Sequence, residues 1–165
     1  MTQNPYNHNP EQPTQPHPVY GQPGYSQPGF EHRMPHQGGA FNGMPADTKS
    51  LALLIHVGTL AATYLSGTLL GFAVPLIFWF IYKDKPGYGY LRATAAGAFN
   101  FSFTMWIINM IANISIIVTL GVAAFVVWPI YLVTGIAMLV IHILAAIKTN
   151  NGEFYTYPLQ MKVLN

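Results

Sequence analysis

Two long stretches of this chain contain no Asp, Glu, Lys or Arg, and no other feature constrains the fold as strongly. They are Leu51–Tyr82, with 32 residues, and Ala93–Ile147, with 55 residues. One crossing of a bilayer takes about 20 apolar residues, so both runs are too long for the core of a soluble domain. Only 7% of all residues are charged, against roughly 25% in soluble domains. The sequence therefore predicts an all-α, multi-pass helical membrane protein.

The lengths of the two stretches predict four apolar helices. As one straight helix, Leu51–Tyr82 would be about 48 Å long, whereas the hydrocarbon core is about 30 Å thick. The sequence Ser66-Gly67-Thr68 interrupts it, which favours a short hairpin of two helices that need not reach the far side. Ala93–Ile147 is long enough for two crossings joined at Thr119-Leu120-Gly121. Within a membrane domain of residues 47–165, we expect spans at 51–66, 69–82, 95–118 and 122–147.

Residues 1–46 have a different composition. They contain nine of the thirteen prolines, six glycines and six glutamines, and no apolar periodicity. Such a segment buries too little apolar surface to offset the entropy lost on ordering, so we predict a disordered N-terminal tail. It is either a solvated linker or an arm whose aromatic residues dock elsewhere. Its histidines do not have the spacing of a metal-ligand set.

The basic residues indicate an orientation. Six of them flank the uncharged stretches: Lys49, Lys83, Lys85, Arg92, Lys148 and Lys162. If the first stretch is a hairpin, all six lie on one side of the membrane, and the positive-inside rule places that side and both termini in the cytoplasm. We therefore expect a plasma-membrane protein that contacts lipid, other membrane proteins or further copies of itself. The net charge of +2 is too small to suggest a nucleic-acid partner.

Four of the polar side chains inside the expected spans are candidate site residues: His56, Asn109, Asn113 and His142. Asn109 and Asn113 are four residues apart and share a helix face. Hydrogen bonding to a neighbouring helix is the favoured interpretation, and a polar stripe along a solute path is the alternative. His56 lies near the start of the first expected span and His142 near the end of the last, so a hairpin would bring them to a similar depth. A structural role is favoured over a proton-relay or pH-sensing pair.

Catalytic motifs are absent from the sequence. It has no Gly-rich phosphate-binding loop, no Gly-x-Ser-x-Gly elbow, no His-Glu-x-x-His and no paired carboxylates. It also has no Cys, so thiol chemistry and Cys-ligated metals are excluded. We therefore expect no enzymatic activity, no cofactor and no bound metal.

Four segments carry a resemblance to known proteins. They are ALLIHVGTLAA at Ala52–Ala62, VPLIFWFIYKDKPG at Val74–Gly87, AFNFSFT at Ala98–Thr104 and AAIKTNNGEFYTYPL at Ala145–Leu159. Through them the chain resembles small bacterial membrane proteins catalogued as a domain of unknown function. Those proteins are distantly similar to the small four-span subunit of the chloroplast inner-envelope import translocon. The resemblance covers about residues 50–162 and implies four segments with both ends inside, but no established activity. Ser102 stands where that family usually has Gln.

The last of these segments is also a candidate docking site for a soluble partner in the cytoplasm. The candidate residues are Arg92, which directly precedes the uncharged stretch Ala93–Ile147, and five residues that follow this stretch: Gly152, Glu153, Tyr155, Tyr157 and Pro158. For the whole chain we predict a non-enzymatic accessory or scaffold subunit of a membrane complex. The alternative is a small oligomeric channel or carrier for a solute or a protein segment, with Ser102, Asn109 and Asn113 along its path and His56 and His142 as its gate.

Overall fold

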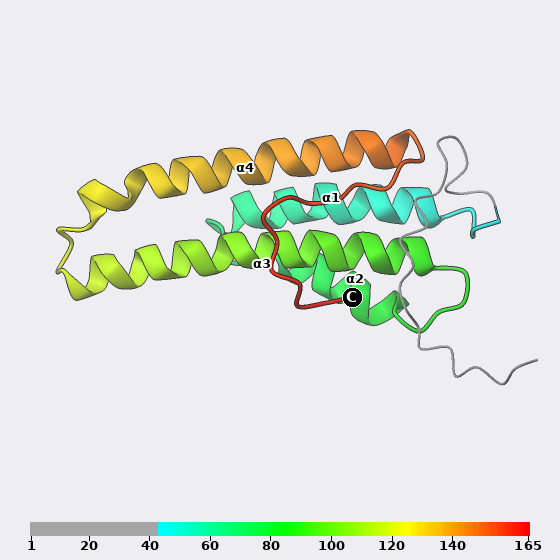
Figure 1. Ribbon diagram of the computed structural model, residues 1–165, viewed down its shortest axis with the longest axis horizontal. Coiled ribbons are helices and arrows are strands. Elements are labelled where there is room, and N and C mark those ends of the chain that lie inside the picture. The colour runs from blue at the N-terminus through cyan, green and yellow to red at the C-terminus, as the bar shows by residue number, and fades with distance from the viewer. Residues whose placement is uncertain (1–42) are drawn as a thin grey trace, which may run out of the picture. The chain divides into compact units, whose positions relative to one another are not determined.

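A computed structural model describes residues 43–165 as four helices. They are α1 (Thr48–Leu65), α2 (Ala73–Tyr82), α3 (Gly89–Val118) and α4 (Ala124–Asn150) (Figure 1). The predicted all-helical class is confirmed for this part of the chain. The predicted N-terminal tail lies almost entirely outside the described residues. Of the four helices, α3 and α4 are long and apolar enough to cross a membrane. The expectation of four apolar spans is therefore confirmed for these two helices alone.

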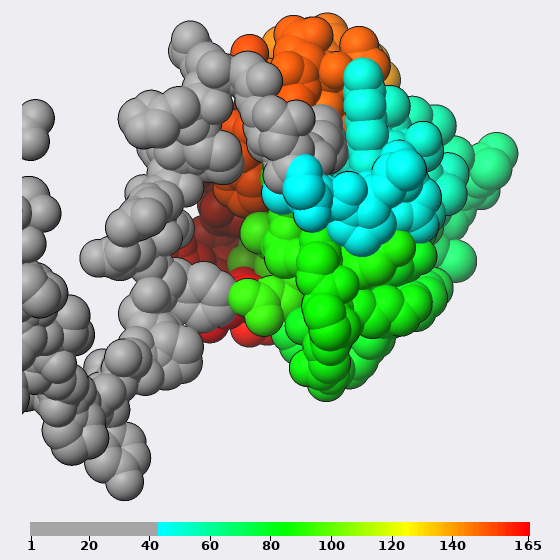
Figure 2. Space-filling view, turned by 90° about the vertical axis from the view of Figure 1, so that its right-hand side faces the viewer, coloured from blue at the N-terminus to red at the C-terminus, as the bar shows by residue number. Residues whose placement is uncertain are grey.

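The four helices form two antiparallel hairpins of unequal length. At 1.5 Å per residue, α1 is about 27 Å and α2 about 15 Å long, whereas α3 and α4 are about 45 Å and 41 Å long. Both hairpins start from the same end, and the short one stops part-way along the long one (Figure 1). Figure 2 looks onto the shared end, where the start of α1, the α2–α3 connection and the end of α4 meet. We call it the charged end, because it holds Lys49, Lys83, Lys85, Arg92 and Lys148.

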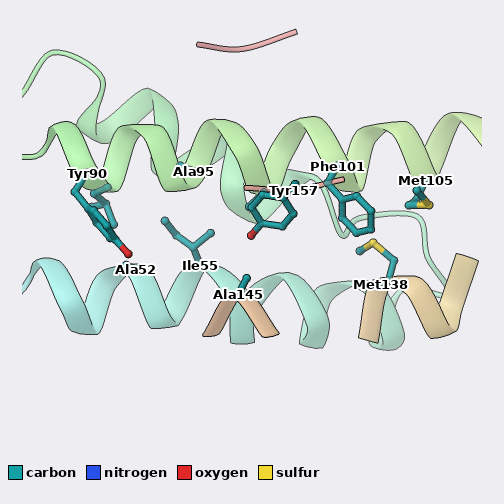
Figure 3. Packing of buried hydrophobic residues seen from close by; sticks show 11 residues of the cluster. Ala52, Ile55, Tyr90, Ala95, Phe101, Met105, Met138, Ala145 and Tyr157 are labelled. Atoms are coloured by element: carbon teal, nitrogen blue, oxygen red, sulfur yellow. The ribbon is translucent and has the colours of Figure 1, made fainter. Parts of the chain in front are cut away.

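A stripe of small and hydroxyl side chains brings α1 close to its neighbours. Its buried residues recur every three or four positions, the spacing of one helix face: Thr48, Ala52, Ile55, His56, Thr59 and Thr63. The hydroxyls of Thr59 and Thr63 donate to backbone carbonyls one turn earlier, at 2.6 and 2.7 Å, so they are satisfied without water. This stripe packs against α3 and α4 around the buried residues shown in Figure 3, among them Phe101, Met138 and Ala145.

The connection between α1 and α2 is longer than the sequence predicted. The second helix begins at Ala73 and not near residue 69, because Ser66–Phe72 forms a compact turn. Gly67 and Thr68 both have positive φ, at 60° and 74°, which ends α1. Gly71 then lies so close to α1 that a Cβ there would overlap the Thr63 hydroxyl. The close approach holds the two short helices together.

Aromatic packing joins the start of α2 to the middle of α3. The Phe72 ring contacts the rings of Phe99, Phe103 and Trp106 edge-on, with centroids 6.2, 5.7 and 5.3 Å away. On the other side of the domain, the Tyr64 hydroxyl near the end of α1 donates to the Gly135 carbonyl of α4 at 2.9 Å. These contacts fix how far the short hairpin extends along the long one.

Replacing Gly71 by Ala should open the short hairpin. The added methyl group must displace the buried Thr63 side chain, so we expect a loss of about 1–3 kcal/mol in unfolding free energy. Gly135→Ala is the matched control, because a Cβ there meets nothing within 4 Å and alanine favours a helix by about 1 kcal/mol over glycine. Denaturant unfolding of the purified protein in mild detergent measures both. Equal stability of the two variants would contradict this account of the turn.

Candidate functional site

The residues that follow α4 form a strap across the other helices. We use the name C-terminal strap for residues 151–165, which turn back at the charged end and run along α3 (Figure 1, red). The turn is closed by Gly152, with a φ of 76°, and by an ion pair of 3.2 Å between Lys148 and Glu153. The Tyr90 hydroxyl of α3 donates to the Glu153 carbonyl at 2.9 Å, which ties the beginning of the strap to α3.

Asn100 of α3 holds the far part of the strap with three hydrogen bonds. Its Nδ2 donates to the Leu164 carbonyl at 2.8 Å, and its Oδ1 accepts from the backbone nitrogens of Val163 and Leu164 at 3.0 and 2.8 Å. One turn further, the Thr104 hydroxyl accepts from the Met161 nitrogen at 3.0 Å. An extended segment has no backbone partners of its own, so polar side chains of α3 supply them.

Tyr157 inserts from the strap into the core between α1, α3 and α4 (Figure 3). Its hydroxyl lies 3.0 Å from His56 Nδ1, and its ring stacks on Phe101 with centroids 5.6 Å apart. Burial raises the pKa of Tyr157 well above its usual value, so the hydroxyl keeps its proton and donates it to His56. Gly97 makes room for this ring, because a Cβ there would lie 2.9 Å from Tyr157 Cδ2.

His56 and His142 lie side by side under the strap. Their ring centroids are 5.9 Å apart and both side chains are fully buried. Because His56 Nδ1 accepts from Tyr157, its proton lies on Nε2, which donates to the Thr149 hydroxyl at 3.2 Å. His142 Nε2 lies 3.1 Å from the Ser102 hydroxyl, and among the described residues its Nδ1 has no hydrogen-bond partner. The pair is therefore bonded to α3, to α4 and to the strap.

Asn109 and Asn113 join α3 to α4. The Thr134 hydroxyl donates to Asn109 Oδ1 at 2.9 Å, and the Tyr131 hydroxyl donates to Asn113 Oδ1 at 2.8 Å. Thr134 is one turn after Tyr131 on α4, so the two bonds follow each other along the same seam. The structure thus brings His56 and His142 together, whereas it places the two asparagines farther along the long hairpin.

The six candidate docking residues do not form one exposed surface. Tyr157 is buried in the core, Glu153 is paired with Lys148, and Gly152 shapes the turn. Tyr155 is half-buried with its ring edge-on to Tyr157, at a centroid distance of 5.0 Å. Arg92 is half-buried near the start of α3, and Pro158 is exposed. This arrangement does not test the prediction that the segment docks a soluble partner. The Tyr157 side chain, however, packs inside the domain and is not available on its surface.

The sequence family described as the magnetosome magnetite crystal formation protein family, MamF/MmsF, matches residues 47–164. The chain belongs to this family. The match begins one residue before α1 and stops at residue 164, one residue before Asn165. It therefore includes all four helices and almost the whole strap. No curated protein and no solved structure matches the chain. MamF/MmsF is a bacterial family of magnetosome membrane proteins, which fits the expected bacterial membrane-protein family, and the likeness to the chloroplast subunit stays a prediction.

Several residues that organise this MamF/MmsF domain were missed in the sequence. Asn100, Thr104 and Thr149 pair with groups 57 or more positions away in the chain. Helical periodicity cannot reveal such pairs, because it reports only neighbours three or four residues apart. Asn100 had one visible signal, since it is an amide in a long uncharged stretch and burying it requires partners.

Replacing Asn100 by Ala should release the far part of the strap. Three hydrogen bonds are lost, each worth about 1 kcal/mol, so the amides of Val163 and Leu164 should exchange hydrogen roughly 100-fold faster. Asn113→Ala is the matched control, because Asn113 bonds to Tyr131 and not to the strap. Hydrogen exchange with mass spectrometry measures the exchange rates of the strap amides in both variants. Unchanged protection in Asn100→Ala would show that these bonds do not hold the strap.

Replacing Tyr157 by Phe tests the link between strap and histidine pair. The ring still fills its place, but His56 Nδ1 loses its donor inside the core, so the unfolding free energy should fall by about 1–3 kcal/mol. Tyr155→Phe is the control, because the hydroxyl of Tyr155 does not bond to the histidine pair. Equal stability of the two variants in denaturant unfolding would contradict the assigned bond.

Proposed function

We propose that this MamF/MmsF member is a non-catalytic, multi-pass membrane protein that serves as a scaffold or accessory subunit of a membrane complex. The observation that carries the proposal is that Asn109 and Asn113 bond to hydroxyls of α4 within the same chain. A polar stripe that guides a solute needs side chains free to exchange partners with it. Here the amide oxygens are engaged in the seam between two helices, which favours a structural role.

The outer surface of the long hairpin supports insertion in lipid. Only 28% and 22% of the apolar windows of α3 and α4 are buried, whereas the core helix of a soluble protein is mostly buried. Large apolar side chains are exposed at the α3–α4 connection and along the adjoining parts of both helices: Ile111, Ile114, Ile117, Leu120, Phe125, Val126 and Trp128. Lipid or apolar helices of a partner would cover such a surface.

The placement of basic residues supports a cytoplasmic charged end. The ends of the helices bring together basic residues from four separate places in the chain, and the α3–α4 connection at the other end has none. The positive-inside rule then favours a cytoplasmic location for the charged end and the strap, in the plasma membrane or a membrane derived from it. Asp47 accepts from the Tyr88 hydroxyl at 3.0 Å, which raises the pKa of Tyr88 and links the α2–α3 connection to the start of α1.

The family description raises the question of how such a protein takes part in mineral formation. Contact with hard metal ions calls for several oxygen ligands in one place. The chain has only five Asp and Glu residues, and the three in the described part, Asp47, Asp84 and Glu153, each have a partner in the domain. We infer that this member contributes to a membrane complex and that residues 43–165 do not themselves present a mineral-binding surface.

A double substitution of Asn109 and Asn113 by Leu tests the proposal. The seam should weaken by about 1–2 kcal/mol, because each intramembrane hydrogen bond contributes roughly 0.6–1 kcal/mol. Ser115→Ala is the matched control, since its hydroxyl bonds only to the Ile111 carbonyl of its own helix. We expect the double variant to lose its partner in affinity capture from native membranes, while the control keeps a stoichiometric partner.

Flux through proteoliposomes distinguishes the alternative. A scaffold should leave vesicles that contain the wild-type protein as tight to ions and small dyes as empty vesicles. Flux through the wild type that disappears in a folded double variant would instead establish a channel or carrier. Recovery of nothing but further copies of the chain in the capture experiment would contradict an accessory subunit.

A further inference from the structure

The two hairpins give the membrane domain different widths at its two ends. The short hairpin reaches Gly135 of α4 through Tyr64, and Trp106 of α3 through Phe72. Beyond these contacts, α3 continues for about 12 residues and α4 for about 11, which is about 16–18 Å of helix. The buried residues of α3 are concentrated in the part that the short hairpin covers. Ten of the thirteen lie between Tyr90 and Ser102.

The uncovered length corresponds to one leaflet. The hydrocarbon core is about 30 Å thick, so a leaflet contributes about 15 Å. If the α3–α4 connection lies at one face of the core, the turn of the short hairpin lies close to the midplane. From the other side, Lys49 and Lys148 belong at the charged face, and α1 reaches its end about 24 Å beyond Lys49. When the thickness of the headgroup region is subtracted from this length, the end of α1 also lies near the midplane.

The turn between α1 and α2 is built to lie in hydrocarbon. Its side chains Leu65, Leu69 and Leu70 are 88%, 50% and 56% exposed and form an apolar surface that hydrocarbon would cover. Backbone groups in lipid must be satisfied within the protein. The Ser66 hydroxyl donates to the Ala62 carbonyl and accepts from the Leu70 nitrogen at 2.8 Å, and the Thr68 nitrogen donates to the Thr63 carbonyl at 2.6 Å.

We propose that the membrane domain is a wedge that binds preferentially to curved bilayers, with the convex leaflet at its charged end. Four helices occupy the leaflet at the charged end, and α3 and α4 alone occupy the opposite leaflet, so the cross-section falls by about half across the midplane. A body that is wider in one leaflet fits best where that leaflet is stretched. With the charged end in the cytoplasm, such a protein favours membrane that bulges into the cell. This inference requires insertion of the long hairpin in a bilayer but not the scaffold role.

Sorting between flat and tubular membrane tests the wedge. The chain has no cysteine, so single cysteines label chosen ends, Asp84→Cys at the charged end and Val122→Cys at the opposite connection. Full-length protein is reconstituted in giant vesicles of neutral phospholipid and labelled from outside with a dye that cannot cross the membrane. Each label then reports molecules of one orientation. A narrow tube is pulled outward, and the ratio of protein to lipid dye in the tube is compared with that in the vesicle.

The wedge predicts opposite signs for the two labels. Molecules labelled at Asp84→Cys have their wide end in the convex outer leaflet, so the ratio should exceed one and rise as the tube narrows. Molecules labelled at Val122→Cys should be depleted from the same tubes, with a ratio below one. Equal ratios for the two labels would overturn the proposal, because a body of constant width has no preferred orientation on a curved surface.

A lengthened short hairpin tests whether the taper is the cause. Adding three helical turns of apolar residues to each limb of the α1–α2 turn, about 11 residues per limb, would fill the second leaflet. This variant, carrying either label, should partition evenly between tube and vesicle. Sorting with the same signs as in the original chain would show that the taper does not produce it. If the lengthened chain does not fold, the comparison of the two labels in the original chain still decides whether the domain is a wedge.

Discussion

Most buried polar groups in the described part of this chain find partners within the molecule, with His142 Nδ1 as an exception, and the arrangement of the helices depends on these pairings. In the turn of the short hairpin, the Ser66 hydroxyl both donates to and accepts from the backbone. Along the long hairpin, Asn109 and Asn113 receive hydroxyl donors from α4. Each hydrogen bond adds only about 1 kcal/mol, but an unpaired buried group would cost about 1–3 kcal/mol, so the partners determine which helices lie together.

The C-terminal strap extends the same constraint to an irregular segment. Asn100 pairs with strap backbone, and Tyr157 joins the strap to His56. Gly97 of α3 leaves the room that the Tyr157 ring fills. The strap is therefore part of the packed domain, which agrees with the extent of the MamF/MmsF match to residue 164. We infer that a change at the histidine pair and a change at the strap affect the same unit.

Much of the architecture could be predicted from the distribution of charge. The uncharged stretches located the helices, and Ser66-Gly67-Thr68 located the turn of the short hairpin, because both are local properties of the chain. The similar depth of His56 and His142 also followed from a hairpin arrangement, and their centroids lie 5.9 Å apart.

What could not be predicted are the contacts between distant segments. Tyr157 was placed in a docking motif, since its neighbours are polar and nothing in the local sequence shows that its ring enters the core. The depth of the short hairpin was also open, because the lengths of 51–66 and 69–82 fit either a thinned crossing or a hairpin that stops inside. The contacts of Tyr64 and Phe72 with the long hairpin show how far the short hairpin extends.

The wedge requires the turn of the short hairpin to lie deep in the bilayer, and a spin label at Leu69→Cys measures that depth. Collision rates with oxygen, which concentrates at the midplane, and with a water-soluble nickel chelate give the depth of the label. We expect high accessibility to oxygen and very low accessibility to nickel, with the label about 15 Å from either face of the core. Nickel accessibility as high as that of a label at Asp84→Cys would contradict this depth, because the turn would then lie in water.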